Sequence, residues 1–258
     1  RYIPGWEIDN FSLRHALSIP RDEIWDAHRR AKQNLLDYVN ANTGADLNPE
    51  IFTLGFARRA ATYKRADLLF DDMDRLRRIA REVGPFQLVF SGKAHPADEG
   101  GQSLIRRIYQ AREELAPEIK VVYLEDYNLK LGLLMTTGVD CWLNNPTPPK
   151  EASGTSGMKS AVNGVPSLSI LDGWWIEGHL EDVTGWAIGD GTTVEDEAVQ
   201  RARDSDSLYE KLESKVLPTY YEHRARWHEI MAQAIALNGS YFNTQRMAQE
   251  YVMKAYFA

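Results

Sequence analysis

The sequence predicts an α/β protein with a doubly wound, mainly parallel, Rossmann-like sheet and a C-terminal helical tail. Five short runs dominated by apolar residues occur between residues 51 and 171, and helical patterns separate them. Strands and helices in alternation indicate parallel βαβ units. The polar residues that follow each run would then share the carboxyl edge of the sheet, where such folds bind ligands.

The five runs have the length and composition of strands that are buried on both faces. They are IFTLGFA at residues 51–57, FQLVFS at 86–91, IKVVYL at 119–124, VDCWL at 139–143 and SLSIL at 167–171. A first helix is predicted at residues 22–40, where Ile24, His28, Ala31, Leu35 and Val39 recur at helical spacing. Further helices are expected between the strands, at residues 68–83, 103–114, 129–136 and 157–163.

The two ends of the chain have a different texture. Residues 1–20 contain two prolines and no clear period, whereas helical patterns recur at residues 207–216, 220–237 and 243–257. We therefore expect an entry segment and helix at 1–45, a Rossmann-like domain at 46–200 and packing helices at 201–258. The aromatic residues among these last helices are expected to pack against the sheet or a neighbour.

Composition narrows the functional classes. The 258 residues carry a formal net charge of -7, so a general attraction to nucleic acid is not expected. No apolar stretch approaches the ~20 residues of a membrane span, and no signal peptide opens the chain. The single cysteine, Cys141, excludes a disulfide framework and favours a reducing, cytoplasmic compartment. The initial Arg indicates a processed chain or a piece of a longer one.

Three polar clusters follow the first three predicted strands. They contain the cations Arg58, Arg59, Lys64 and Arg65, then Lys93 and His95, then Tyr127. Cations at the start of a helix are opposed by its dipole, so they indicate an anion at that end. The alternatives stay open: a solvated basic face paired with nearby aspartates, a structural histidine, and a tyrosine that only packs.

The fourth cluster, at residues 144–164, predicts a phosphate-binding loop. Three prolines impose an extended approach, and the small residues from Gly154 to Gly157 then precede a helical run. Free backbone N–H groups, hydroxyls and the positive end of a helix suit a phosphate, with Lys159 close enough to reach it. Glu151 could accept hydrogen bonds from sugar hydroxyls. The spacing fits neither a Walker loop nor GxGxxG, and no metal site is indicated. Several cations around one cradle further suggest two adjacent phosphates.

These segments closely resemble those of the α-glucan (glycogen, starch or maltodextrin) phosphorylases. EASGTSGMK at 151–159, followed by NGVPSLSILDGWWIEG at 163–178, resembles the segment that carries the pyridoxal-phosphate lysine. FARRAATYKR at 56–65 resembles the phosphate-binding turn, and SGKAHPAD, YLEDY, GWAIGDG and FNTQRMAQEYV resemble other segments in the same order. The resemblance covers nearly the whole chain and is weak before about residue 51.

The resemblance implies the C-terminal, cofactor-binding half of a GT-B fold. Lys159 would form the Schiff base with pyridoxal 5′-phosphate, whose phosphate is the working group. Arg58, Lys64, Thr155 and Ser156 would hold that phosphate, with Tyr127 nearby. Arg59 and Lys64 would hold the substrate phosphate, and Glu151, Ser153 and Gly154 would face the hydroxyls of the transferred glucose. Lys159, Arg59 and Lys64 are the implied catalytic residues.

The implied reaction is reversible phosphorolysis of an α-1,4-glucan to glucose 1-phosphate. Ser156-Gly157 stands where animal and plant members have Gly-Asn, which with DGWW points to the shorter prokaryotic branch. The N-terminal domain that completes the cleft is absent from the sequence. The chain alone is therefore expected to be inactive, with the C-terminal helices packing on the sheet domain or on that missing domain. A homodimer remains one expectation for its assembly.

Two rival functions remain. A nucleotide-sugar-dependent retaining glycosyltransferase of the GT-B type usually has Glu-x7-Glu in this segment, but the residue eight after Glu151 is Lys159. A lysine can form an imine and cannot accept a proton from a ribose hydroxyl, which favours pyridoxal phosphate. A non-catalytic carbohydrate-binding paralogue is opposed, though not excluded, by the intact lysines and arginines.

Overall fold

A six-stranded, wholly parallel sheet forms the centre of the computed structural model, which describes residues 2–257. Its strands are β1 (Phe52–Ala57), β2 (Phe86–Ser91), β3 (Val121–Leu124), β4 (Cys141–Asn144), β5 (Ser167–Ile170) and β6 (Gly185–Ile188). The spatial order is β3-β2-β1-β4-β5-β6, so the chain winds outward in one direction from β1 and then in the other from β4. The prediction of a doubly wound Rossmann-like sheet is confirmed.

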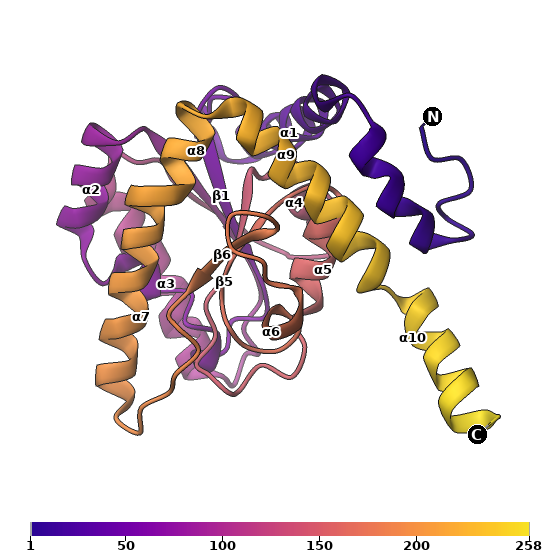
Figure 1. Ribbon diagram of the computed structural model, residues 1–258. Coiled ribbons are helices and arrows are strands. Elements are labelled where there is room, and N and C mark those ends of the chain that lie inside the picture. Colours follow the sequence, from indigo (N-terminus) through magenta and orange to yellow (C-terminus); the bar gives the residue numbers. More distant parts are fainter. Residues whose placement is uncertain (1, 258) are drawn as a thin grey trace.

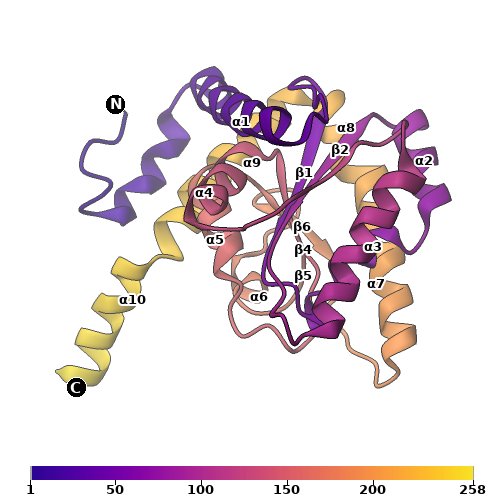
Figure 2. The same cartoon turned by 180° about the vertical axis from the view of Figure 1, so that it is seen from behind.

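Helices lie on both faces of this sheet (Figure 1 and Figure 2). The α-helices are α1 (Arg21–Thr43), α2 (Met73–Glu82), α3 (Glu99–Leu115), α4 (Leu129–Gly138), α5 (Thr155–Val162), α6 (Trp175–Gly178), α7 (Glu197–Lys211), α8 (Leu217–Tyr221), α9 (Arg224–Gln233) and α10 (Thr244–Tyr251). Shorter 3-10 and π-helical segments are η1 (Asn10–Ser18), η2 (Thr62–Lys64), η3 (Leu68–Phe70), η4 (Leu212–Val216), η5 (Ala234–Gly239) and η6 (Val252–Tyr256).

Two apolar cores follow from the alternation of side chains along the strands. Phe52, Leu54 and Phe56 of β1 point into a core that also contains side chains from α2, α3, α7, α8 and α9. Ala57 and Val89 belong to the other core, with side chains from α1 and α4. Burial on both faces explains why the strands are continuous apolar runs in the sequence.

Several element boundaries differ from the sequence-based prediction. The strand β6 was not predicted, because GWAI is short and begins with a glycine whose φ is 147°. The helix expected at 68–83 is divided into η3 and α2, because Asp72 adopts an extended conformation and caps the N–H of Arg75. The helix expected to begin at residue 207 begins at Glu197, and the entry segment contains η1.

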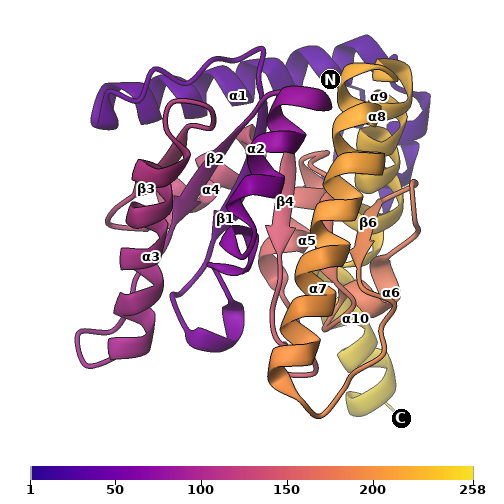
Figure 3. The same ribbon diagram turned by 90° about the vertical axis from the view of Figure 1, so that its left-hand side faces the viewer.

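A buried polar network fixes α1 across the amino end of the sheet (Figure 3). The Lys32 ammonium lies 2.6 Å from the Asp140 carboxylate and 2.8 Å from the Ile51 carbonyl, and His28 Nε2 lies 2.9 Å from the other oxygen of Asp140. Burial opposes ionisation of Asp140, but the Lys32 and His28 interactions outweigh it and lower its pKa. This network ties the helix to the strands that carry the site at their opposite end.

A second ionic cluster supports the outer strand. The carboxylate of Glu181 contacts His179 at 2.8 Å and Lys211 at 2.5 Å, and it accepts the N–H of Ala187 in β6. Burial would raise the pKa of Glu181, but these partners lower it to about 2. The cluster therefore joins β6 to α7 at neutral pH.

The last helix extends away from the sheet and lies near the N-terminal segment (Figure 1). The side chain of Gln245 in α10 accepts the N–H of Asn10 and donates to the carbonyls of Glu7 and Ile8, so the two ends of the chain are hydrogen-bonded. Large apolar side chains on this helix and just after it are exposed, including Met247, Tyr251 and Met253. Within residues 2–257, no helix combines the length and apolar character that crossing a membrane requires.

Candidate functional site

The site lies where the direction of winding of the sheet reverses, between β1 and β4. These strands are hydrogen-bonded neighbours, with Leu54 opposite Cys141 and Gly55 opposite Trp142. The connection after β1 leads to β2 and the connection after β4 leads to β5, on opposite sides. The two connections separate at the carboxyl ends of these strands, which is the position where doubly wound sheets bind ligands. The first residue after β1 is Arg58, and β4 ends at Asn144.

A compact ion cluster fills this position. One oxygen of the Glu151 carboxylate lies 2.5 Å from the Arg58 guanidinium and 2.6 Å from the Lys64 ammonium. Arg58 also donates to the amide oxygen of Asn144, whose amide nitrogen donates to Ser169 at 3.0 Å. These side chains are buried, so the charges interact in a partly desolvated environment. The structure therefore brings together Arg58, Lys64 and Glu151, three of the predicted site residues.

Electrostatics keep the carboxylate of this cluster ionised. Burial alone would raise the pKa of Glu151, but hydrogen bonding to Lys64 and the charge of Arg58 outweigh burial and lower it. The phenol of Tyr63 beside the cluster also has a lowered pKa, chiefly through its hydrogen bond to Lys64, with a smaller contribution from Arg59. Arg59 itself is exposed. Anionic groups are thus favoured at this edge of the sheet.

Arg65, the fourth cation of this segment, has a different environment. Its guanidinium donates to the carbonyls of Asn145 and Pro146 at 2.9 and 2.7 Å and lies 2.8 Å from the Asp204 carboxylate. The Asn145 side chain donates back to the Arg65 carbonyl at 3.0 Å. Arg65 therefore holds the segment after β4 in place, and its Nε and Nη2 groups are already engaged within the protein.

The loop from Glu151 to Gly154 leads directly into α5. Gly154 has φ +83° and serves as the N-cap, and no side chain caps the helix. The N–H groups of Thr155 and Ser156 in the first turn consequently have no acceptor within the helix. An uncapped helix start with unpaired N–H groups is the backbone geometry that an anion cradle requires, and the binding of an anion here stays a prediction.

Lys159 lies just over one turn into α5, and its side chain is exposed. Its ammonium forms no hydrogen bond or ion pair with the described part of the chain, and only its backbone carbonyl is engaged, by Asn163 at 2.7 Å. The structure therefore does not bring Lys159 into contact with the Arg58–Lys64–Glu151 cluster. An uncommitted primary amine next to an anion cradle is free to react with a carbonyl group.

The segment SGKAHPAD runs beside the first basic segment, because Arg58 N–H donates to the Ser91 carbonyl and Ala60 N–H to the Lys93 carbonyl. Its two candidate side chains face outward: Lys93 lies 3.7 Å from Asp126 in an exposed pair, and His95 caps its own turn at Ala97.

Tyr127, from the third cluster, is half-buried among apolar side chains of the second core, and burial raises its pKa. For this tyrosine the structure shows a packing role.

The residues after β5 were not predicted from the sequence, although they shape the loop. The Asp172 carboxylate accepts the N–H of Glu151 at 2.9 Å, and Trp174 N–H donates to the Ser153 carbonyl at 2.8 Å. Asn144 was likewise missed as an acceptor for Arg58. Their position after a buried strand was the available signal, because strand ends of a parallel sheet share one edge.

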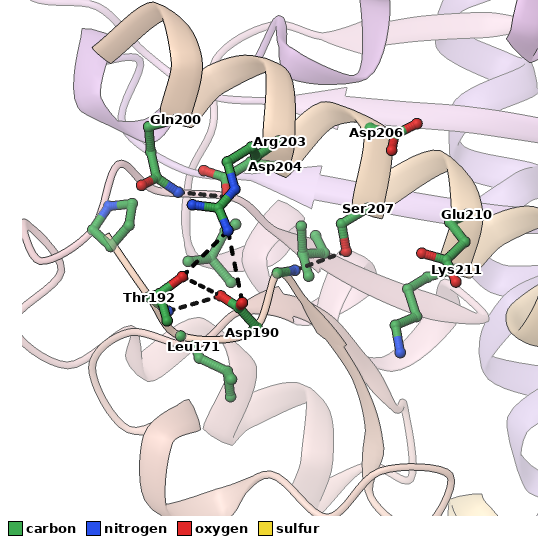
Figure 4. Close-up of a pocket in the computed structure, with 15 residues that line it drawn as sticks. Leu171, Asp190, Thr192, Gln200, Arg203, Asp204, Asp206, Ser207, Glu210 and Lys211 are labelled. Carbon is green, nitrogen blue, oxygen red and sulfur yellow. Dashed lines mark hydrogen bonds and ion pairs between the residues drawn. The ribbon is translucent and has the colours of Figure 1, made fainter. Parts of the chain in front are cut away.

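A separate cavity of about 370 Å³ lies between the ends of β5 and β6 and the helix α7 (Figure 4). Its polar side chains bond one another: Gln200 donates to Asp204 at 2.8 Å, and Asp190 accepts from Thr192 at 2.6 Å. None of the predicted site residues lines this cavity. Among the residues with defined positions, no group of three or more His, Cys, Asp or Glu side chains could hold a metal ion.

Comparison with known proteins is consistent with this geometry. The model of the carbohydrate phosphorylase family matches residues 18–185. The chain is 41% identical over 251 residues to the maltodextrin phosphorylase of Thermococcus litoralis, covering 92% of this chain and 30% of that protein. It is 40% identical over 263 residues to the glycogen phosphorylase of Aquifex aeolicus, covering 92% and 37%.

The glycogen phosphorylase of Mycobacterium tuberculosis is 37% identical over 246 residues, which cover 90% of this chain and 28% of that protein. The chain thus spans about a third of the length of these relatives. This partial coverage agrees with the expectation that the sequence corresponds to one portion of a phosphorylase. The family match extends over most of the chain and includes every predicted site residue. The chain belongs to the carbohydrate phosphorylase family.

Proposed function

We propose that this chain is the cofactor-binding, C-terminal half of a GT-B α-1,4-glucan phosphorylase, which releases glucose 1-phosphate from a glucan and inorganic phosphate. The observation that carries the proposal is the uncommitted Lys159 amine in α5, one turn beyond an uncapped helix start. The cations at the neighbouring strand end add a second place for a phosphate.

The donor set fits pyridoxal 5′-phosphate. Lys159 would attach to its aldehyde, and the N–H groups of Thr155 and Ser156 would receive its phosphate. Arg58 and Lys64 would contribute positive charge to that phosphate. Tyr127, whose ring is half-buried against the second core, would lie near the bound cofactor. When bound, the cofactor would supply its 5′-phosphate as a proton-exchanging neighbour for the substrate phosphate.

The remaining predicted residues suit the sugar and the substrate phosphate. Arg59 and Lys64 would hold inorganic phosphate or glucose 1-phosphate, because both lie at the carboxyl end of β1. Hydrogen bonds with glucose hydroxyls would come from Glu151, Ser153 and Gly154. Glu151 now pairs with two cations, so it would exchange one of them for a hydroxyl when phosphate enters.

These residues would act by binding and orientation. Concentrated positive charge stabilises the phosphate that delivers a proton to the glycosidic oxygen, and it holds that phosphate on one face of the sugar. Delivery and return of the phosphate on the same face would give retention at the anomeric carbon. Arg59 and Lys64 would thus supply electrostatic stabilisation, and Lys159 would fix the position of the cofactor.

The isolated chain is proposed to be incomplete. An N-terminal phosphorylase domain would supply the glucan groove and the opposite wall of the phosphate site. The exposed apolar side chains of α10 and η6 offer a surface for that domain, or for a second copy in a homodimer. We place the complete enzyme in the cytoplasm. The pure 258-residue chain should release no measurable glucose 1-phosphate from maltoheptaose.

An absorbance titration with pyridoxal phosphate tests the proposal. The chain should develop a near-ultraviolet imine band that borohydride fixes to Lys159, and Lys159→Ala should lose it. Lys150→Ala is the matched control, because Lys150 lies in the same segment and forms only an exposed pair with Glu197 at 3.0 Å. Absence of a band in the unmodified chain, together with tight UDP-glucose binding, would instead support the nucleotide-sugar glycosyltransferase. A chain that binds neither ligand would fit a non-catalytic paralogue.

A further inference from the structure

The carboxylate of Asp172, just after β5, holds the backbone of the phosphate loop. Its Oδ2 accepts the Glu151 N–H at 2.9 Å, and its Oδ1 accepts the Gly173 N–H at 2.9 Å. The residue is buried, and its carboxylate is in no ion pair within the described part of the chain. A buried carboxylate without a cation is unfavourable unless hydrogen bonds satisfy it. The two charge-assisted bonds therefore commit Asp172 to fixing these backbone groups.

The turn at residues 172–174, which contains Asp172, also bonds the loop at a second point. Trp174 N–H donates to the Ser153 carbonyl at 2.8 Å, so residues 172–174 hold the loop on both sides of Ala152. The Trp174 ring then covers the start of α5. A Cβ added to Gly157 would lie 2.8 Å from Trp174 Nε1 and 3.0 Å from Cζ2, so a larger residue would push the ring and helix apart.

We propose that the turn at residues 172–174 is the positioning element of the phosphate loop and that Asp172 is its principal positioning residue. By fixing Glu151 and Ser153, the turn orients the free N–H groups of Thr155 and Ser156 before a ligand arrives. Donors that are held in place lose less conformational freedom on binding, so the phosphate binds more tightly. The inference rests on the proposed function, because it takes the phosphate of pyridoxal phosphate as the ligand of this loop.

Comparison of two ligands tests this role. Pyridoxal phosphate engages both Lys159 and the loop, whereas pyridoxal lacks the phosphate and can engage only the lysine. Asp172→Asn keeps the shape of the side chain but replaces one acceptor oxygen with a donor that cannot bond the facing N–H. Spectral titration should show about tenfold weaker binding of pyridoxal phosphate, the effect of one lost charge-assisted hydrogen bond. Pyridoxal binding should be unchanged.

Asp190→Asn is the matched control. Asp190 follows the next strand, accepts hydrogen bonds from Thr192 in its own loop and lies 3.8 Å from Arg203 of α7, so within residues 2–257 none of these contacts reaches the phosphate loop. This variant should bind both ligands as the unmodified chain does. Gly157→Ala perturbs the turn through a different contact, the one between α5 and the Trp174 ring. It should weaken the binding of pyridoxal phosphate but not of pyridoxal. This variant keeps the test available if circular dichroism shows that Asp172→Asn does not fold.

The outcomes separate the two proposals. If the unmodified chain forms no imine at Lys159, the proposed function fails and this inference fails with it. If the unmodified chain binds normally but Asp172→Asn and Gly157→Ala leave pyridoxal phosphate affinity unchanged, only the positioning role is overturned. A folded variant that loses affinity equally for both ligands also overturns it, because general destabilisation would then explain the loss.

Discussion

Replacing Glu151 with glutamine should separate the stabilising role of the ion cluster from its capacity to bind anions. In the structure, one carboxylate pairs with two buried cations, Arg58 at 2.5 Å and Lys64 at 2.6 Å. Glu151→Gln keeps the size of the side chain but removes the charge. The two cations then remain close together with a neutral acceptor, and the folded state becomes less stable unless an anion is present.

The magnitude follows from the burial of all three groups. Their side chains are 7 to 9% exposed, so solvent screens the pairs weakly. Removing one partner of a buried ion pair costs about 3–5 kcal/mol. Because glutamine retains one acceptor oxygen, we expect the free energy of unfolding to fall by about 2–3 kcal/mol at pH 7. Phosphate at one hundred times its Kd should raise the free energy of unfolding of the variant by about 2.7 kcal/mol.

Urea denaturation followed by circular dichroism, in a phosphate-free buffer and then with phosphate, measures both effects. Phosphate should stabilise the unmodified chain less, because it must first displace the Glu151 carboxylate. The pKa of Glu151 is lowered, so its contribution is complete above the ordinary glutamate pKa of about 4.3 and is lost as the pH falls below that value.

Glu125→Gln is the control, because this exposed glutamate hydrogen-bonds only Tyr109 within residues 2–257, and it should change stability by less than about 0.5 kcal/mol. Equal stability of Glu151→Gln and the unmodified chain, or an equal gain from phosphate, would refute the reasoning.

Three further measurements test groups outside the site. Lys32→Met leaves the buried Asp140 carboxylate without its ammonium, so stability in urea should fall by about 3–5 kcal/mol. Lys93→Met breaks an exposed ion pair and should lower the free energy of unfolding by less than about 1 kcal/mol. Equal losses of stability in the two variants would contradict a stabilising role for the Lys32–Asp140 network. Glu181, with a pKa of about 2, should contribute stability that is lost as the pH falls from the ordinary value toward 2, so Glu181→Gln should flatten the pH dependence of the urea midpoint there. The Cys141 thiol is buried and its pKa is raised, so DTNB should react with it only after unfolding.

The sequence was sufficient to predict that the site residues lie close together, because the order of strands and helices constrains where they lie. Once apolar runs and helical patterns alternate, every residue that follows a strand must reach the same edge of a parallel sheet. Arg58 directly follows β1, and Glu151 follows β4 after a proline-rich segment. Their pairing across 93 positions needed only this rule and the correct identification of two strands.

The chemical use of each side chain could not be predicted in the same way. Arg58 and Arg65 occur in one basic segment, but Arg65 is held by the carbonyls of Asn145 and Pro146 and by Asp204. The partner in α7 lies 139 positions away, and no local pattern marks it. The missed strand β6 illustrates a related limit, because four residues with an initial glycine give almost no periodic signal.

The charge balance at the strand ends bears on how many phosphates the proposed site can hold. Arg58, Arg59 and Lys64 supply three positive charges, and Glu151 removes one of them. Two phosphate groups at pH 7 would carry about three to four negative charges. The N-terminus of α5 offers the equivalent of about half a positive charge, which leaves part of the negative charge uncompensated. Two adjacent phosphates repel each other strongly unless further cations lie close to them. Under the proposed function, the cofactor and substrate phosphates should therefore bind together only when further positive groups are supplied from outside residues 2–257, whereas one phosphate should bind to this chain alone.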